Sequence, residues 1–323
     1  DFIIVFNLLV LNNLFNTLNK RIYIVCLNVY GLQLKNFDMN KYKQILSKLV
    51  TNKINVITRS LSSSNINQIE KIEIRLNENT LLGQKGDLIN LRLDEVITPK
   101  VLTNGAWEPE IINILKKFIK LDQKYIFFDI GCNIGLTSRQ ILNSFDNIDH
   151  SFHIEPSKKN IEIAKLNLSK FKNTIFVNKA LAKKSGREIL YKNSVNYGNY
   201  SLDSNSIQSS QYEEEVVEIE NINDFFSSVI NQYNFKIIIK SDTEGFDYKL
   251  LSFIDDKILA EIEIYYLEIS NKLSSNELDL IYNKLVDFNI YNEKLKKINN
   301  TIEVFQNEIM SYKNNTDIIL VRK

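Results

Sequence analysis

Apolar runs alternate with amphipathic stretches from Tyr125 to the C-terminus. The apolar runs predict buried strands over residues 125–130, 151–154, 174–177, 236–239 and 264–267, with a further strand over 317–321. Helical spacing begins near Leu136 and recurs over residues 158–168 and 274–287. Strands that alternate with helices in this way predict an α/β fold with a parallel sheet and helical crossovers.

The first hundred residues have a different pattern. Alternating or β-favouring residues between glycine and asparagine breaks predict short strands over 72–76, 88–93 and 95–99, and residues 39–49 have helical spacing. A helix is expected over 108–119, with Pro109 in its first turn, where the missing N–H costs nothing. We therefore predict an N-terminal α+β extension of unknown role at residues 1–100 and the main domain at 101–323.

Charge and composition exclude several classes of site. Forty basic and thirty-nine acidic residues leave a net charge of +1, so no overall field attracts nucleic acid. Cys26 and Cys132 are the only cysteines, and His150 and His153 the only histidines, which argues against a disulfide scaffold or a metal cluster. We expect no metal site and no nucleic-acid partner, and we expect His153, inside a strand, to be structural.

The N-terminal apolar run from Phe2 to Leu11 is shorter than the roughly 20 residues that a membrane-spanning helix needs. The core of a signal peptide can be as short, but no basic residue precedes this run and no clear cleavage site follows it. A cytoplasmic protein without stable membrane insertion is therefore expected. The sequence begins at Asp1 rather than Met, so it can be a fragment, and it leaves the oligomeric state open.

The candidate cofactor site starts where the first strand of the main domain ends. Gly131 and Gly135 allow the backbone after this strand to turn sharply and approach a ligand closely. Leu136 stands where a dinucleotide-binding turn has its third glycine. Asp129, in front of the turn, repels phosphate but suits the amino group and sulfonium of S-adenosylmethionine. The turn therefore favours S-adenosylmethionine over a dinucleotide.

Glu155 ends the second strand, about 20 residues after the glycine turn, where nucleotide-binding βαβ units carry an acid that accepts both ribose hydroxyls. Adenosine is common to S-adenosylmethionine and NAD, so Glu155 alone is compatible with either cofactor. The simpler alternative is a negative charge at the N-terminus of the following helix.

Five short motifs resemble those of the FkbM family of methyltransferases. They are Gly105-Ala-Trp-Glu-Pro109, Asp129-Ile-Gly-Cys-Asn-Ile-Gly135, Glu155-Pro156, Ala180-Leu181 followed by Gly186, and Ile239-Lys-Ser-Asp-Thr-Glu-Gly245. The resemblance implies a Rossmann-like class I methyltransferase sheet with helices on both faces, completed by strands near residues 290–304 and 317–321. It also implies a set of cofactor-binding residues: Asp129, Gly131, Asn133, Gly135, Glu155, Pro156, Ala180 and Asp242.

The last motif supplies the candidate catalytic residues. Alternate residues of a strand share a face, so Lys240, Asp242 and Glu244 are expected to point the same way. A hydroxyl needs a general base to attack a sulfonium methyl group, and Asp242 is the first candidate, with Glu244 the second. The alternative is that Asp242 or Thr243 caps a helix that starts near Phe246.

The predicted function is S-adenosylmethionine-dependent methyl transfer. The family resemblance implies an oxygen acceptor on a sugar or a secondary metabolite, so the partner is a small molecule or a glycan, and it places the loop at residues 196–202 near that acceptor. The two tyrosines and two amides of this loop suit stacking on and hydrogen bonding to a sugar. The alternatives are a nicotinamide-dependent oxidoreductase and a catalytically silent methyltransferase-like binding domain.

Overall fold

The computed structural model describes residues 54–57, 71–76, 78–92, 96–193, 196–203, 212–233 and 235–323. The chain divides into two compact units, Asp1–Trp107 and Glu108–Lys323. The sequence-based boundary after residue 100 lies seven residues before this division. Every predicted cofactor-binding or catalytic residue belongs to the second unit. Among the described residues, no helix combines the length and apolarity needed to cross a bilayer.

The first unit contains a small antiparallel sheet and one described helix. The sheet has the order β1-β2-β3, formed by β1 (Ile54–Ile57), β2 (Lys71–Leu76) and β3 (Leu88–Arg92). The strand expected over residues 95–99 is wrong, because helix α3 (Ile97–Asn104) begins there and buries Ile97, Val101 and Leu102 along one side. The expected helix at 39–49 lies outside the described residues.

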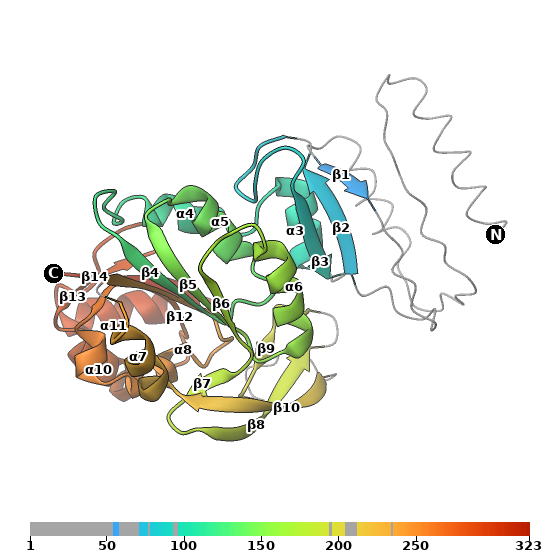
Figure 1. Cartoon of the computed structure of the whole chain (residues 1–323). Coiled ribbons are helices and arrows are strands. Elements are labelled where there is room, and N and C mark those ends of the chain that lie inside the picture. The colour runs from blue at the N-terminus through green and yellow to red at the C-terminus, as the bar shows by residue number, and fades with distance from the viewer. Residues whose placement is uncertain are drawn as a thin grey trace. The chain divides into compact units, whose positions relative to one another are not determined.

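The second unit is built on a seven-stranded sheet with the order β13-β14-β12-β11-β4-β5-β6 (Figure 1). All neighbours pair in parallel except β14, which is antiparallel to both of its neighbours. The strands are β4 (Tyr125–Ile130), β5 (Ile148–Ile154), β6 (Thr174–Val177), β11 (Lys236–Ser241), β12 (Ile262–Ile269), β13 (Phe288–Asn292) and β14 (Thr316–Arg322). The predicted α/β class, with a parallel sheet and helical crossovers, is confirmed.

Helices cover both faces of this sheet (Figure 1). One group consists of α4 (Glu110–Leu115), α5 (Leu136–Ser144) and α6 (Lys158–Leu168), which contact one another in turn. The other group is α7 (Ile222–Ile230), α8 (Asp247–Phe253), α9 (Asp256–Leu259), α10 (Ser275–Lys284) and α11 (Ile302–Ser311). On the second face Phe128 of β4 stacks on Phe152 of β5 and meets Phe226 of α7 edge to face. Adjacent side chains of a strand point to opposite faces, so both faces of β4 are buried.

Two expected elements near the helices have different bounds. The helix expected over residues 108–119 is confined to α4, and Pro109 is its N-cap. The strand expected over 290–304 ends at Asn292, and α11 starts at Ile302 because Thr301 caps it by accepting a hydrogen bond from the Val304 N–H. Phe305 and Ile309, four residues apart, bury one side of α11, which is helical rather than strand spacing.

A second sheet is inserted between β6 and α7. Its order is β7-β10-β8-β9, from β7 (Ala180–Ala182), β8 (Gly186–Asn193), β9 (Tyr200–Ser201) and β10 (Tyr212–Asn221). None of these strands was predicted from the sequence, and most of residues 201–212 lie outside the described residues. Leu190, Val217 and Ile219 form its small core, while the other face carries charged residues together with the exposed Ile189 and Val216.

Candidate functional site

The central sheet contains a point at which the chain reverses its direction of travel across the strands. From β4 the chain moves to β5 and β6 on one side, and it returns on the other side of β4 at β11. In open α/β sheets, ligands bind in the crevice outside the carboxyl ends of the strands at such a switch point. The motifs at residues 129–135 and 239–245 lie at the carboxyl ends of β4 and β11, so the topology brings them together.

The glycine turn after β4 is packed tightly against the end of β11. Gly131 has φ +78°, and a β-carbon there would overlap the main-chain carbonyl oxygen of Asp242. The Asp242 N–H donates to the carbonyl of Ile130 at 3.0 Å, which ties the two strand ends together. Gly135 has φ +76° and packs on Ala164 of α6. Both glycines are therefore required by the packing of the chain itself.

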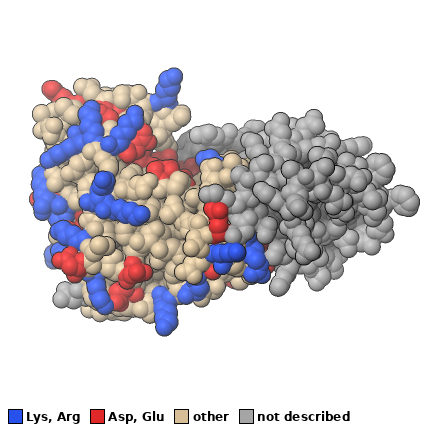
Figure 2. Space-filling model, turned by 90° about the horizontal axis from the view of Figure 1, so that it is seen from above, with Lys and Arg blue, Asp and Glu red and all other residues tan. Residues whose placement is uncertain are grey.

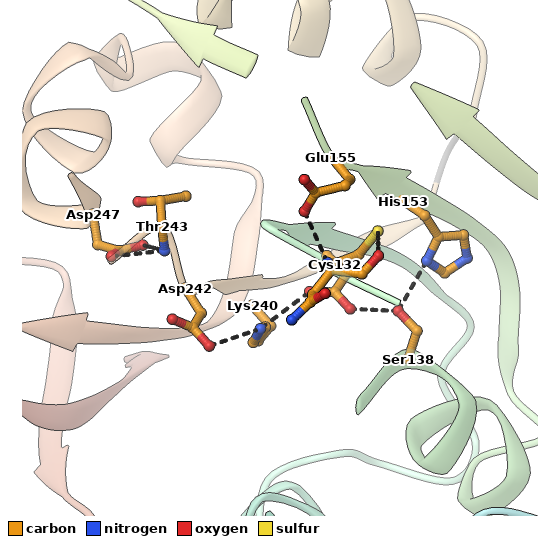
Figure 3. Close-up of polar contacts among 10 residues, drawn as sticks. Cys132, Ser138, His153, Glu155, Lys240, Asp242, Thr243 and Asp247 are labelled. Carbon is orange, nitrogen blue, oxygen red and sulfur yellow. Dashed lines mark hydrogen bonds and ion pairs between the residues drawn. The ribbon is translucent and has the colours of Figure 1, made fainter. Parts of the chain in front are cut away.

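Glu155 links the glycine turn to the start of α6 through its two carboxylate oxygens. Its Oε2 accepts from the Asn133 N–H of the turn at 3.0 Å (Figure 3). Its Oε1 accepts from the Ser157 N–H at the start of α6 at 2.8 Å. Burial raises the pKa of Glu155 to about 7, against the two backbone hydrogen bonds that lower it. Asn133 has φ +50°, and its side-chain Oδ1 is buried without a hydrogen-bond partner. Glu155 thus lies at the N-terminus of α6, as the simpler alternative expected, and it also binds the glycine turn.

Asp129 is fully buried at the end of β4. Its Oδ2 accepts a hydrogen bond from the Ser138 hydroxyl, and its Oδ1 lies 3.4 Å from Lys240 Nζ. Ser138 Oγ is also 2.9 Å from His153 Nδ1 (Figure 3). His153 Nε2 is 2.9 Å from Ser151 Oγ. Burial lowers the pKa of His153 to about 3, so the imidazole is neutral. A neutral ring that donates from Nδ1 to Ser138 satisfies every link of this chain.

Lys240 stands between two carboxylates of very different exposure. Its Nζ is 3.4 Å from Asp129 Oδ1 and 3.4 Å from Asp242 Oδ2 (Figure 3). Burial lowers the pKa of Lys240, but the nearby carboxylates of Asp129, Asp242 and Glu108 outweigh it and raise the pKa. The Lys240 side chain is 6% exposed, whereas the side chain of Asp242 is 37% exposed. Of the three charged side chains Asp129, Lys240 and Asp242, that of Asp242 is therefore the most exposed.

Glu244 is held by the inserted sheet. Asn199 Nδ2 donates to Glu244 Oε2 at 2.8 Å, and Ser201 Oγ donates to the Glu244 carbonyl at 3.0 Å. Burial, followed by the charge of Asp242, raises the pKa of Glu244 to about 8. The structure thus brings part of the loop at 196–202 to the end of β11. Both of its amides already have intramolecular partners, since Asn196 Oδ1 accepts from the Gly198 N–H.

The expected capping of the following helix by Asp242 or Thr243 is wrong. Helix α8 starts after Phe246 without a side-chain cap. The bond runs in the opposite direction, because the buried Asp247 carboxylate accepts from the Thr243 N–H at 3.0 and 3.2 Å (Figure 3). Burial raises the pKa of Asp247 to about 6. Asp247 therefore fixes the turn after β11, and Asp242 does not cap α8.

Three further carboxylates, not predicted from the sequence, face the cluster of Lys240, Asp242 and Glu244. Glu108 lies just before α4 at φ +45°, and burial together with Asp242 raises its pKa to about 7. Burial and Asp242 raise the pKa of Glu268 on β12 to about 9. Burial also raises the pKa of Asp317 on β14 to about 6, and the Tyr266 hydroxyl donates to it at 2.6 Å. Glu108 was within a quoted motif, but nothing near the other two in the sequence marks them.

Two predicted cofactor residues lie at the margin of the group. Pro156 follows Glu155, and Asn178 Nδ2 donates to the main-chain carbonyls of both residues at 2.9 Å. Ala180 belongs to β7 and packs with Leu190 and the rest of the core of the inserted sheet. The structure therefore does not bring Ala180 into the cluster of acids around Lys240.

Metal ligation and surface charge give no further site. Across the described ranges there is no group of three or more histidine, cysteine or acidic side chains arranged to hold a metal ion. Lysine and arginine side chains are spread over the face shown in Figure 2, with acidic side chains among them. This face therefore carries no continuous basic surface of the kind that binds a phosphate backbone.

Comparisons with known proteins identify no family, since no family model and no curated protein matches the chain. Solved structures do match it. A methyltransferase FkbM from Methylobacillus flagellatus KT is 13% identical, with a TM-score of 0.40 over 71% of this chain and 56% of its own. Aeropyrum pernix fibrillarin with natively bound S-adenosyl-L-methionine is 7% identical (TM-score 0.35; 82% and 100% covered). An rRNA methylase from Streptococcus thermophilus is 10% identical (TM-score 0.33; 66% and 93% covered).

These likenesses concern the arrangement of the chain alone. The chain spans little more than half the length of the FkbM structure, and membership of that family stays a prediction. The expectation that nucleic acid is not a partner stays a prediction. The cytoplasmic location also stays a prediction.

Proposed function

We propose that the second unit is an S-adenosylmethionine-dependent methyltransferase that acts on a hydroxyl of a small-molecule or glycan acceptor. The observation that carries the proposal is the Glu155 carboxylate, fixed by the N–H groups of Asn133 and Ser157 beside the glycine turn. A carboxylate oxygen accepts more than one hydrogen bond, so both oxygens retain capacity for ribose hydroxyls. Asn133 Oδ1, buried and unpaired, offers a further acceptor at the same turn.

The charge of the crevice favours this cofactor over a dinucleotide. Asp129, Asp242 and Glu108 surround a single Lys240, so the switch point carries an excess of negative charge. Such a site repels a pyrophosphate and stabilises a cation. When bound, S-adenosylmethionine supplies a methyl group on a positively charged sulfur. Glu155 alone fits NAD equally well, and the carboxylates around Lys240 separate the two cofactors.

Asp242 is proposed as the general base because its side chain is more exposed than those of Asp129 and Lys240. Its carboxylate takes the proton of the acceptor hydroxyl as the hydroxyl oxygen bonds to the methyl carbon and the carbon–sulfur bond breaks. Lys240, 3.4 Å from Asp242 Oδ2, holds that oxygen in place. Lys240 is thereby proposed as a positioning residue, because its own side chain is shielded from the acceptor.

Calorimetric titration of the full chain with S-adenosylmethionine, S-adenosylhomocysteine and NAD tests the cofactor. Micromolar binding of the first two, without competition by NAD, is expected. Glu155→Ala should weaken binding by about 1.5 to 3 kcal/mol, the range for hydrogen bonds to a charged group. The matched control is Glu162→Ala, an exposed acid of α6 paired with Lys165. Saturable NAD binding with no response to S-adenosylhomocysteine contradicts the proposal. A panel of saccharides then tests the acceptor class.

A further inference from the structure

Two side chains of the inserted sheet reach the proposed reaction site at Glu244. Asn199 and Ser201 reach it from the turn before β9 and from β9 itself, more than forty residues earlier in the chain. Asn199 is 6% exposed and Ser201 is 1% exposed. Two buried polar side chains of the insertion are therefore committed to a residue of the central sheet, which indicates a specific link rather than a surface contact.

Glu244 has a backbone conformation that its own side chain does not favour. Its φ is +53°, and Gly245 follows at φ +91°. A residue with a β-carbon in the left-handed region carries strain of the order of 1 kcal/mol, which persists where neighbouring groups fix it. Ser201 binds the carbonyl of this residue, and Asn199 binds its carboxylate. The insertion thus fixes both the main chain and the side chain of Glu244.

We propose, on the basis of the proposed methyl-transfer function, that Asn199 and Ser201 are positioning residues that present Glu244 to the acceptor. Asn199 engages Oε2, so Oε1 is the oxygen left to bind an acceptor hydroxyl. When Glu244 is protonated, the proton resides on Oε1, because Oε2 is accepting from the amide. Glu244 then donates to a hydroxyl oxygen of a neutral polyol while Asp242 removes the proton from the reacting hydroxyl.

The charges around Glu244 agree with a donor role near neutral pH. Carboxylates face it from the end of β11 (Asp242), from α8 (Asp247), from the segment before α4 (Glu108) and from β12 (Glu268). Burial, followed by Asp242 and then Asp247 and Glu108, raises its pKa to about 8, against the hydrogen bond from the Asn199 amide, which lowers it. Loss of that amide therefore shifts the titration upward.

Titration of the Glu244 carboxyl by NMR tests the proposal without an acceptor. The full chain is labelled with ¹³C-glutamate, and the Glu244 signal is assigned by its loss in Glu244→Gln. Asn199→Ala should raise the pKa of Glu244 by about one, the size expected when a net hydrogen bond to a charged group is lost. Asn199→Asp, which keeps the shape, should raise it further, because two adjacent carboxylates resist joint ionisation.

The control separates positioning from a general loosening of the insertion. The Asp203 carboxylate of the insertion pairs with Lys249 of α8 at 3.1 Å, while its main-chain N–H, which donates to Ser201 Oγ, is retained in Asp203→Asn. Asp203→Asn breaks that link and should leave the Glu244 titration unchanged. An unchanged titration in both Asn199 variants, or an equal shift in Asp203→Asn, overturns the proposal. Thermal unfolding of each variant identifies any that fail to fold.

Kinetics provides the second measurement, with an acceptor found in the saccharide panel. Asn199→Ala should raise the acceptor KM about tenfold while the calorimetric Kd for S-adenosylmethionine stays within twofold of wild type. Ser201→Ala should have the same effect to a smaller degree. If the wild type does not bind S-adenosylmethionine, the proposed function fails, and the NMR titration still decides whether Asn199 positions Glu244. An unchanged KM together with an unchanged titration contradicts the inference alone.

Discussion

The carboxyl ends of β4 and β11 carry acids that the sequence does not distinguish but the structure does. Asp129 is the penultimate residue of β4 and Asp242 follows β11, and both contact the same lysine at 3.4 Å. Asp129 is fully buried and accepts a hydrogen bond from Ser138, whereas more than a third of the Asp242 side chain is exposed. One acid is part of the interior, and the other is open to a ligand.

The difference in burial gives Asp129 and Asp242 different roles, which their sequence motifs alone do not distinguish. A buried carboxylate with a paired lysine and a hydroxyl donor has its charge already compensated, so it holds the strand ends together. An exposed carboxylate beside the same lysine keeps its orientation and can still exchange a proton. The catalytic proposal therefore depends on Asp242. Asp129 orients the Lys240 side chain from its buried side.

The largest effect is expected where the two strand ends meet. In Gly131→Ala the added β-carbon overlaps the Asp242 carbonyl oxygen, and alanine disfavours φ +78°. Since the obstacle is main chain, we expect a loss of more than about 4 kcal/mol in the free energy of unfolding, or failure to fold. Denaturant unfolding measures this.

The control is Gly186→Ala, because no atom lies within 4 Å of a β-carbon built at Gly186. Its free energy of unfolding should stay within about 0.5 kcal/mol of wild type. Equal stability of the two variants would show that the strand ends are not in the contact described here.

The next effect distinguishes the buried acid from the open one. Asp129→Asn leaves Lys240 with one neighbouring carboxylate fewer in a buried setting, and breaking such a pair costs about 3 kcal/mol of stability. Asp242→Asn, at the more exposed of the two acids, should change the free energy of unfolding by less than about 1 kcal/mol. Chemical denaturation of both variants at pH 7 provides the measurement. Similar losses in the two variants would contradict the division of roles.

The sequence predicted the elements whose burial is continuous. β4 is buried at all six positions, and its apolar run and following glycine turn were recognisable without a partner. The inserted sheet was missed because β8 and β10 bury little: residues 213–215 are glutamates, and Val216 is largely exposed. Pairing between β8 and β10 stabilises these strands, and pairing across a chain segment is not visible in local composition.

The residues of the candidate site were likewise predictable only where the local sequence marks them. Lys240, Asp242 and Glu244 were found because one short motif contains them. The carboxylates of Glu268 and Asp317 reach the group only because β12 and β14 lie beside β11, so sheet order alone identifies them. The sequence also did not predict which acid is exposed: Asp129 is fully buried and accepts a hydrogen bond from Ser138 of α5, whereas the Asp242 side chain is 37% exposed.

The third effect concerns turnover. Asp242→Asn keeps the size of the side chain and removes the base, so single-turnover methyl transfer should fall by about 100-fold or more, while S-adenosylmethionine affinity and stability are retained. Asp256→Asn, at a side chain that is 95% exposed, is the control with wild-type rates. A joint loss of affinity and rate would assign Asp242 to the methionine end of the cofactor. A wild-type rate would transfer the role of base to Glu244.

The smallest expected effect is a pH dependence of S-adenosylmethionine affinity, which arises at Glu155 after β5. The ionised Glu155 carboxylate accepts hydrogen bonds from ribose hydroxyls at both oxygens, whereas its protonated form loses one acceptor. Because burial raises the pKa of Glu155 to about 7, S-adenosylmethionine affinity should rise as the pH increases from 6 to 8, by about tenfold. Glu155→Gln removes the titrating group and should bind weakly with a flat profile over this range. Calorimetry at each pH measures both.

Stability should change with the opposite sign, which identifies the group. A carboxyl whose pKa is 4.5 in the unfolded chain and about 7 in the folded protein binds more protons when folded. The free energy of unfolding of the ligand-free protein should therefore fall as the pH rises from about 4.5 through about 7, and this component should vanish in Glu155→Gln. If Glu155 both holds the turn and receives the cofactor, affinity should increase and stability decrease with pH, and both components should be lost in Glu155→Gln. If both profiles persist in Glu155→Gln, the titrating group is another carboxyl whose pKa burial raises, such as Glu108, Glu244, Asp247 or Asp317, and the cofactor contact assigned to Glu155 is wrong.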